Sequence, residues 1–527
     1  MFQKIRELSK NLAIYGLGDV AIQLVNFLLL RVYVEYLSRE DYGILALLGS
    51  VEAITKLFFR WGVDGSFMRF WYDCEDDRSR QRLASTLFFF LLITNGVLLA
   101  AAVALAPFFA SSFLDLGGSR VTLALQLVLL NTFAIGFTFI PFHVLRMQQR
   151  AREFSALAFA RSAATLLLRL GLVVGLGYGV MGVVVADLVV TAVLLAVMVR
   201  YFAPLIRPLF STATLRESLA FGLPRIPHGF AQQVIAVGDK FVLTRFVSLA
   251  DVGLYSMGVS VGLIQKVFLA AFEYAWAPFY YATVREPGAQ RIFSAVTTYG
   301  VAILALMTAG LSAIAADLLT VVTHGQYTAA AGVVAWTSLG VLFQGVYLMT
   351  SIGLNITKQT QYYPVATAIA AAANIGFNFL LIPYYGIMGA AYANGIAYAL
   401  QAVIAFFFSQ RAYPVKYENG RLVKVALAAL VAYAVARTLP SMPPIAGLLV
   451  RGTTVVGVMT AGLWLGGFLR ADELAVLQRV RRARTATAPP PAETTEFAGE
   501  IVAADIPEPA DAAIAERLDP RRREQTR

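Results

Sequence analysis

The sequence predicts an all-α polytopic membrane protein with fourteen transmembrane helices and with both chain ends in the cytoplasm. Three observations predict this fold class: the composition, the alternation of positive charge between apolar segments, and an internal repeat. Of 527 residues, 58% are hydrophobic and 14% are charged, with a mean hydropathy of +0.67. Soluble domains carry about 25% charged residues. The composition therefore indicates an integral membrane protein with many spans.

Fourteen segments are apolar over about 20 residues, the length at which a helix crosses a bilayer. They lie near 11–37, 42–67, 83–109, 121–145, 154–175, 179–203, 218–247, 252–282, 292–320, 329–355, 362–383, 386–409, 422–438 and 445–469. With the N-terminus placed in the cytoplasm, the inner loops and tails hold nearly all of the loop Lys and Arg residues. The outer loops hold Arg39, Arg120 and Arg437. This is the positive-inside pattern, and it explains the net charge of +11 without nucleic acid as a partner.

Two sequence matches reveal the internal repeat. The pentapeptide at 178–182 (YGVMG) recurs 207 residues later at 385–389 (YGIMG). Segment 30–44 aligns with 240–254 at an offset of 210, with four identical pairs: Val32/Val242, Ser38/Ser248, Asp41/Asp251 and Gly43/Gly253. The offset corresponds to six helices, so the two copies keep the same orientation in the membrane, as in parallel transporter repeats. We expect both pentapeptides on outer turns whose glycines let adjacent helices close up.

The repeat divides the chain into parts. We expect an N-lobe of helices 1–6, a cytoplasmic linker, a C-lobe of helices 7–12, two extra C-terminal helices, and a mostly disordered cytoplasmic tail. In that order, the parts span 1–203, 204–217, 218–410, 411–470 and 471–527. The seventh helix contains Pro224 and Pro227, which should break or kink it.

Several predicted helices carry charged residues. A charge at the bilayer centre costs roughly 2.5–3.5 kcal/mol on insertion scales, so such residues face a cavity or a partner. Glu52/Lys56 and Arg60/Asp64 have the i, i+4 spacing of ion pairs. Such pairs either hold helices together or line a cavity, and the spacing leaves both interpretations open.

Four other cations are harder to assign to packing. Arg161 and Arg169 share one stripe of the predicted fifth helix, which offers no acid on that stripe, so each needs a partner elsewhere or an anionic ligand. The same holds for Arg225 and Arg245. A net cationic cavity between two lobes suits a phosphorylated substrate, because arginine matches the geometry of phosphate. The three histidines lie on separate segments, so we predict no metal site, and we expect no cofactor.

Three stretches resemble a known family. They are LVNFLLLRVYVEYLSREDYGILAL near the N-terminus, FGLPRIPHGFAQQVIAVGDKFVLTRFVSLADVGLYSMG at 221–258, and LLIPYYGIMGAAYANGIAYAL at 380–400. They are similar to polysaccharide biosynthesis flippases (Wzx-like) of the multidrug/oligosaccharidyl-lipid/polysaccharide exporter superfamily. The resemblance covers roughly residues 8–470. It implies two six-helix lobes, a central cavity and alternating access, and its substrates are undecaprenyl-diphosphate-linked oligosaccharides. By position, it implies the substrate-binding candidates Arg60, Arg161, Arg169, Arg225 and Lys266.

The leading hypothesis is a non-enzymatic flippase of the bacterial inner membrane that moves a polyprenyl-diphosphate-linked glycan for cell-surface polysaccharide synthesis. Its expected partners are this glycan, membrane lipid, and a polysaccharide polymerase with its export machinery. Protons or the membrane potential would drive it. The candidate coupling residues are Asp19, Asp64, Asp187 and Asp239. The alternatives are a cation-coupled multidrug antiporter of the same superfamily, which would need an acid-rich site, and a membrane-embedded polysaccharide enzyme.

Overall fold

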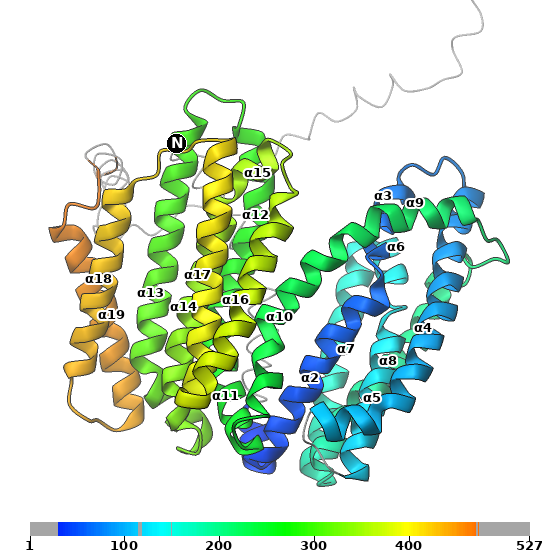
Figure 1. The fold of residues 1–527 in the computed structure, drawn as a ribbon, viewed down its shortest axis with the longest axis horizontal. Helices are drawn as coiled ribbons and strands as arrows, with labels where there is room; N and C mark the ends of the chain where they lie inside the picture. The colour runs from blue at the N-terminus through cyan, green and yellow to red at the C-terminus, as the bar shows by residue number, and fades with distance from the viewer. Residues whose placement is uncertain (1–29, 114–117, 149, 471–472, 474–527) are drawn as a thin grey trace, which may run out of the picture. The chain divides into compact units, whose positions relative to one another are not determined.

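A computed structural model describes residues 30–113, 118–148, 150–470 and 473, and within them the chain is helical, with no β-strand (Figure 1). The N-lobe segment contains a helix over 30–36 and then α2 (Arg39–Arg60), α3 (Val63–Trp71), α4 (Asp77–Phe113), α5 (Ser119–Ile135), α6 (Phe139–Met147), α7 (Ala151–Leu170), the π-helical turn η1 (Gly171–Gly175) and α8 (Gly179–Phe202). Residues 204–412 contain α9 (Thr212–Gly222), η2 (Leu223–Arg225), α10 (Ile226–Leu243), α11 (Leu249–Gly262), η3 (Leu263–Gln265), α12 (Lys266–Thr283), α13 (Ala289–Thr323), η4 (Thr328–Ala330), α14 (Ala331–Thr350), α15 (Ile352–Ile356), α16 (Tyr362–Tyr385) and α17 (Ile387–Ala412). The last two helices are α18 (Asn419–Thr438) and α19 (Pro444–Leu465).

Within the described ranges, 12 helical segments are long and apolar enough to cross a membrane. They coincide with twelve of the fourteen predicted spans, so the class of all-α multi-span membrane protein is confirmed. The predicted first span, 11–37, lies mostly outside the described residues, and with it Asp19. The predicted seventh span, 218–247, is helical but interrupted. The count of fourteen therefore stays a prediction.

Several of the predicted spans are divided into shorter helices, and the breaks in the seventh and second spans have different causes. In the seventh span, α9 ends at Gly222, the turn η2 follows, and α10 begins at Ile226 with Pro227 in its first turn. A proline lacks the N–H group that would continue the helix, so the predicted break at these prolines is confirmed. The second span is also divided, because Trp61 (φ 49°) and Gly62 (φ 67°) adopt left-handed conformations between α2 and α3.

The repeated sequences have matching conformations. Ser38 caps α2 and Ser248 caps α11, each in a reciprocal capping box with the aspartate three residues later. In the pentapeptides, Gly179 has a φ of 54° and Gly386 a φ of 55°, which glycine adopts readily. Glycines three positions further on give close helix contacts: a Cβ atom on Gly182 would lie 3.2 Å from Leu172, and one on Gly389 would lie 2.4 Å from the Leu381 carbonyl oxygen. The expected role of the turn glycines is thus confirmed.

The two copies of the other repeated segment cross each other, with α2 packed against α11 (Figure 1). A Cβ atom built on Gly43 would lie 2.2 Å from the Leu249 carbonyl oxygen. A Cβ atom on Gly253 would lie 2.1 Å from the carbonyl oxygen of Arg39. The contact is reciprocal, because Arg39 and Leu249 are equivalent positions 210 residues apart. Only glycine permits this approach, so the repeat forms its own crossing point, which we call the glycine crossing.

Two arginines reinforce the contact near the glycine crossing. Arg39, at the start of α2, donates a hydrogen bond to the carbonyl oxygen of Gln326, just after α13, and its guanidinium lies 5.7 Å from the ring centroid of Tyr327. Arg245, just after α10, donates a hydrogen bond to the carbonyl oxygen of Ser112 at the end of α4. In each repeat, one arginine thus donates a hydrogen bond at the C-terminal end of a helix in the other repeat, where backbone carbonyl groups lack helical partners.

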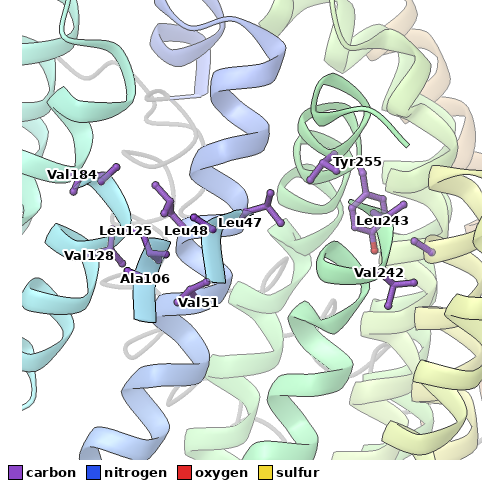
Figure 2. Close-up of a cluster of buried hydrophobic side chains, with 14 of the residues drawn as sticks. Leu47, Leu48, Val51, Ala106, Leu125, Val128, Val184, Val242, Leu243 and Tyr255 are labelled. Carbon is purple, nitrogen blue, oxygen red and sulfur yellow. The ribbon is translucent and has the colours of Figure 1, made fainter. Parts of the chain in front are cut away.

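The largest buried cluster is built around α2. Figure 2 shows Leu47 and Leu48 of α2 between Leu125 of α5 on one side and Leu243 and Tyr255 of α10 and α11 on the other. Leu47, Leu48, Leu125 and Leu243 are at most 1% exposed. Burial of such side chains stabilises each by roughly 1.5–3 kcal/mol. One helix of the first repeat therefore carries the apolar contact to the second.

The two C-terminal helices pack against α13 and against each other. Arg451 of α19 donates to Asp317 of α13 at 2.5 Å, and both side chains are less than a fifth exposed. Gly447 lies one turn earlier, where a Cβ atom would touch the Asp317 carboxylate. The chain up to Phe468 forms one compact unit, and a second begins at Leu469. Apart from Glu473, the predicted tail 471–527 lies outside the described residues.

Candidate functional site

The helical hairpin of α7 and α8 joins two candidate residues in an ion pair. Arg169 lies nine residues before Tyr178 and Asp187 nine residues after it, so the tight turn places them opposite each other. The Arg169 guanidinium donates to Asp187 through Nε at 2.8 Å and through Nη2 at 2.5 Å. Its Nη1 donates to the Tyr33 hydroxyl at 3.0 Å. Three hydrogen bonds therefore fix this arginine, and the partner it needed lies on the neighbouring helix.

Arg161 has a different environment. It lies eight residues before Arg169 on α7 and is half-buried. It interacts electrostatically with Asp187 and Glu52. Among the described residues no hydrogen bond or ion pair to its guanidinium is found. Because a guanidinium has five N–H donors, Arg161 retains its capacity to bind an anion.

Helix α2 completes the group of charges. Glu52 interacts electrostatically with Lys56, Asp187, Arg169 and Arg161, and Lys56 is also within electrostatic reach of Arg60. We call this set the charged cluster, and its members are Glu52, Lys56, Arg60, Asp64, Arg161, Arg169 and Asp187. It contains four cations and three carboxylates, so it carries a net positive charge.

The Arg60–Asp64 ion pair is longer and more exposed than the Arg169–Asp187 pair. Its closest atoms, Nη1 and Oδ2, are 3.5 Å apart, and the two side chains are 35% and 34% exposed. A pair with this exposure contributes little to stability, at most about 1 kcal/mol. Arg60 can therefore turn to another anion at low cost.

Of the two remaining cationic candidates, one lies near the charged cluster. Arg225 in η2 stacks 4.4 Å from the centroid of the Phe221 ring. Its Nη1 lies against Gly65, the neighbour of Asp64, at 3.0 Å from where a Cβ atom would stand. Lys266 is the half-buried first residue of α12, and in the described part of the chain no charged partner or hydrogen bond is found for it. The structure thus brings Arg60, Arg161, Arg169 and Arg225 toward one region and leaves Lys266 apart.

The coupling candidates fall into three environments. Asp19 lies outside the described residues, and Asp64 and Asp187 are the ion-paired acids of the charged cluster. Asp239 is 1% exposed in α10. It accepts hydrogen bonds from the Tyr255 hydroxyl and from the backbone N–H of Lys240. It is therefore a separate buried carboxyl group that links α10 to α11.

Three residues of the site, Tyr33, Glu52 and Lys56, were not among the predicted binding or coupling residues. Tyr33 orients Arg169, but a tyrosine in an apolar helix gives no signal of this role. Glu52 and Lys56 were predicted only as an i, i+4 pair that either holds helices together or lines a cavity. The hairpin register, nine residues on either side of Tyr178, is a signal that could have paired Arg169 with Asp187.

The fold is similar to those of known structures. The chain is similar to the lipid II flippase MurJ in an inward closed conformation, with a TM-score of 0.68 and 14% identity over 85% of this chain and 98% of that one. It is also similar to a multidrug resistance MATE family transporter of the MOP superfamily. The inward-facing form gives a TM-score of 0.63 with 16% identity over 74% of this chain and 94% of that one. The outward-facing form gives 0.52 with 17% identity over 78% and 96%. These likenesses establish the fold, which is that of polytopic membrane transporters.

The sequence assigns the chain to a protein family. A family model described as "Polysaccharide biosynthesis protein" matches residues 35–331, more than half of the chain. The chain belongs to this family, which confirms the resemblance seen in its sequence. No curated protein sequence matches the chain.

Proposed function

We propose that the protein is a flippase that carries a polyprenyl-diphosphate-linked oligosaccharide across the bacterial inner membrane for cell-surface polysaccharide synthesis. The observation that carries the proposal is the charged cluster, in which cations outnumber carboxylates. Within the described residues, Arg161 and Lys56 have no hydrogen-bonded partner. A diphosphate offers the charge and acceptor oxygens that these donors lack. Membership of a polysaccharide biosynthesis family supports the choice of substrate class.

In this mechanism the cations have separate roles. Arg161 and Lys56 bind the diphosphate directly, and Arg60 joins them by leaving its weak pair with Asp64. Arg169 is held by Asp187 and positions the α7–α8 hairpin. The glycan occupies the space between the lobes while the polyprenyl tail stays in lipid. The lobes then rock about the glycine crossing, which changes the side from which the site is open.

We also choose among the candidate coupling residues. Asp64 and Asp187 are engaged by arginines, so protonation of either would leave a cation without its partner. Asp239 accepts hydrogen bonds from neutral donors, the Tyr255 hydroxyl and a backbone amide, and also interacts electrostatically with the adjacent Lys240. It forms no ion pair with an arginine among the described residues, and its buried charge is costly. We therefore favour Asp239 as the residue that takes up a proton during the cycle. Asp239→Asn should abolish the dependence of translocation on a proton gradient, and an unchanged dependence would contradict this assignment.

The experiment for the main proposal compares two arginines on one helix. Purified full-length protein in proteoliposomes is assayed for translocation of a fluorescent polyprenyl-diphosphate-linked sugar. Each charge-assisted hydrogen bond contributes about 1.5–3 kcal/mol, so Arg161→Gln should lower the rate roughly ten- to hundredfold. The thermal stability of the Arg161→Gln variant should equal that of the wild type. Arg169→Gln should lower stability as well, because it leaves the Asp187 carboxylate without its partner.

Arg216→Gln is the matched control, because Arg216 is an exposed cation of α9 outside the charged cluster. It should keep both rate and stability. A rate for Arg161→Gln equal to that of this control would refute the diphosphate site. Active transport of organic cations by the wild type, strengthened by Arg161→Gln, would favour the drug antiporter instead.

A further inference from the structure

A second charged site lies at the opposite end of the α7–α8 hairpin from its turn. The first turn of α7 and the last turn of α8 border an open surface cavity of about 330 Å³ lined by Arg150, Glu153, Arg200 and Tyr201. None of these residues belongs to the charged cluster. The charge pattern of the sequence places this end of the hairpin on the cytoplasmic side. We call the cavity the hairpin pocket.

The polar contacts in the hairpin pocket form a connected set. Arg150 Nε donates to Glu153 Oε1 at 2.6 Å, and the Tyr201 hydroxyl donates to Glu153 Oε2 at 2.6 Å. Arg200 Nη2 donates to the Tyr201 hydroxyl at 2.8 Å. The two guanidinium groups also lie 5.4 and 4.7 Å from the centroid of the Tyr201 ring. One carboxylate and one ring therefore hold two arginines at the same cavity.

This arrangement leaves positive charge unsatisfied. Both carboxylate oxygens of Glu153 are engaged, and the two arginines exceed it by one charge. Among the described residues, the terminal nitrogens of Arg150 make no hydrogen bond. Arg150 is also the N-cap residue of α7, and its side chain does not cap the helix. The first backbone N–H groups of α7 therefore point toward the hairpin pocket without a side-chain acceptor from the N-cap residue. Helix N-termini of this kind bind phosphate.

The surface beside the hairpin pocket is apolar. Val197 and Val193 precede Tyr201 by one and two helical turns and are 41% and 57% exposed. Apolar side chains exposed on a membrane-spanning helix are suited to contact with acyl chains. The site therefore combines a basic pocket at the inner membrane surface with an apolar stripe that continues into the bilayer, and basic pockets between transmembrane helices on the cytoplasmic side bind anionic lipid head groups.

We propose that the hairpin pocket binds a phosphate-bearing anion, the head group of an anionic phospholipid of the cytoplasmic leaflet. The phosphodiester accepts hydrogen bonds from Arg150, Arg200 and the first turn of α7, and the acyl chains lie along Val197 and Val193. The bound lipid anchors this end of the α7–α8 hairpin at the membrane surface. This site is independent of the proposed transport substrate.

The test measures binding to the full-length protein in detergent micelles. Dioctanoyl phosphatidylglycerol, dioctanoyl phosphatidylcholine and inorganic phosphate are titrated by microscale thermophoresis. The doubly substituted variant Arg150→Gln/Arg200→Gln should bind phosphatidylglycerol at least about tenfold more weakly than the wild type. Arg285→Gln/Arg291→Gln is the matched control, since it removes two exposed arginines, one in the α12–α13 connection and one in the first turn of α13, on the same predicted side of the membrane. It should bind within about twofold of the wild type, because screened charges at a distance contribute little.

The titrations also identify the source of the anion. Binding of phosphatidylglycerol that inorganic phosphate does not displace supports a lipid site, whereas displacement by phosphate supports an anion site open to soluble ligands. If Arg150→Gln/Arg200→Gln binds phosphatidylglycerol as tightly as the wild type, the proposal is overturned. If that variant does not fold, Arg200→Gln alone is used, because among the described residues Glu153 forms its ion pair with Arg150 and not with Arg200. Equal affinity again overturns the proposal.

Discussion

The glycine crossing makes a quantitative prediction for Gly43→Ala. The added Cβ atom would stand 2.2 Å from the Leu249 carbonyl oxygen, whereas ordinary contact begins at 3.4 Å, so the backbones must separate by about 1.2 Å. A gap of 0.5–1 Å already forfeits about a quarter to a half of the dispersion energy of atoms in contact. The buried side chains around Leu47 would lose contact with α10 and α11 in this way. We expect a loss of about 2–3 kcal/mol of stability, after about 1 kcal/mol gained from the helix propensity of alanine.

The equivalent substitution Gly253→Ala should cost about as much, because its Cβ atom would stand 2.1 Å from the carbonyl oxygen of Arg39. The two substitutions should not add. Separation of the two helices by one added methyl group also makes room for the second. The double variant should therefore lose about as much stability as either single variant. Gly49→Ala on the same helix is the control, since nothing lies within 4 Å of its Cβ position.

Thermal unfolding can be followed with a fluorogenic thiol dye, because Cys74 is the single cysteine of the chain and is partly buried. Gly49→Ala should melt at or slightly above the wild-type temperature, and both crossing variants should melt clearly below it. The explanation fails if Gly43→Ala behaves like Gly49→Ala. It also fails if the double variant loses the sum of the two single effects, since that would mean the two sites are independent.

Three further predictions concern contacts outside the charged cluster. Ser38→Ala and Ser248→Ala should each lower stability by about 1 kcal/mol in the same melting assay, because each removes the cap of an equivalent helix, and clearly unequal losses would argue against that equivalence. Asp317→Asn should destabilise the protein by roughly 3 kcal/mol, since it leaves Arg451 charged and poorly compensated in the membrane, whereas Asp317→Leu/Arg451→Leu should recover much of the loss. Gly386→Ala should cost at least about 1 kcal/mol by forcing a non-glycine residue to a positive φ, and a neutral effect would show that the turn relaxes freely.

The sequence was sufficient to predict the fold class, the repeat and the broken seventh span, because apolar length, charge alternation and prolines act locally. It did not predict the division between α2 and α3, since a left-handed Trp61 depends on tertiary packing. The partner of Arg169 was also missed, because the pair joins two helices across a turn and has no spacing rule of the i, i+4 kind. The glycine crossing was visible only as an identical Gly43/Gly253 pair, and only the structure shows that the two residues touch.

The reason for two aspartates in the capping boxes emerges from the direction of the crossed helices. Both α2 and α11 begin near the glycine crossing, and each helix N-terminus carries roughly half a positive charge from its macrodipole. Two such ends held in contact repel each other. Asp41 and Asp251 each place a negative charge in the first turn of their own helix, which offsets this repulsion. Each copy of the repeated sequence thus supplies an acidic side chain at the helix N-terminus that the glycine crossing brings close to the other copy.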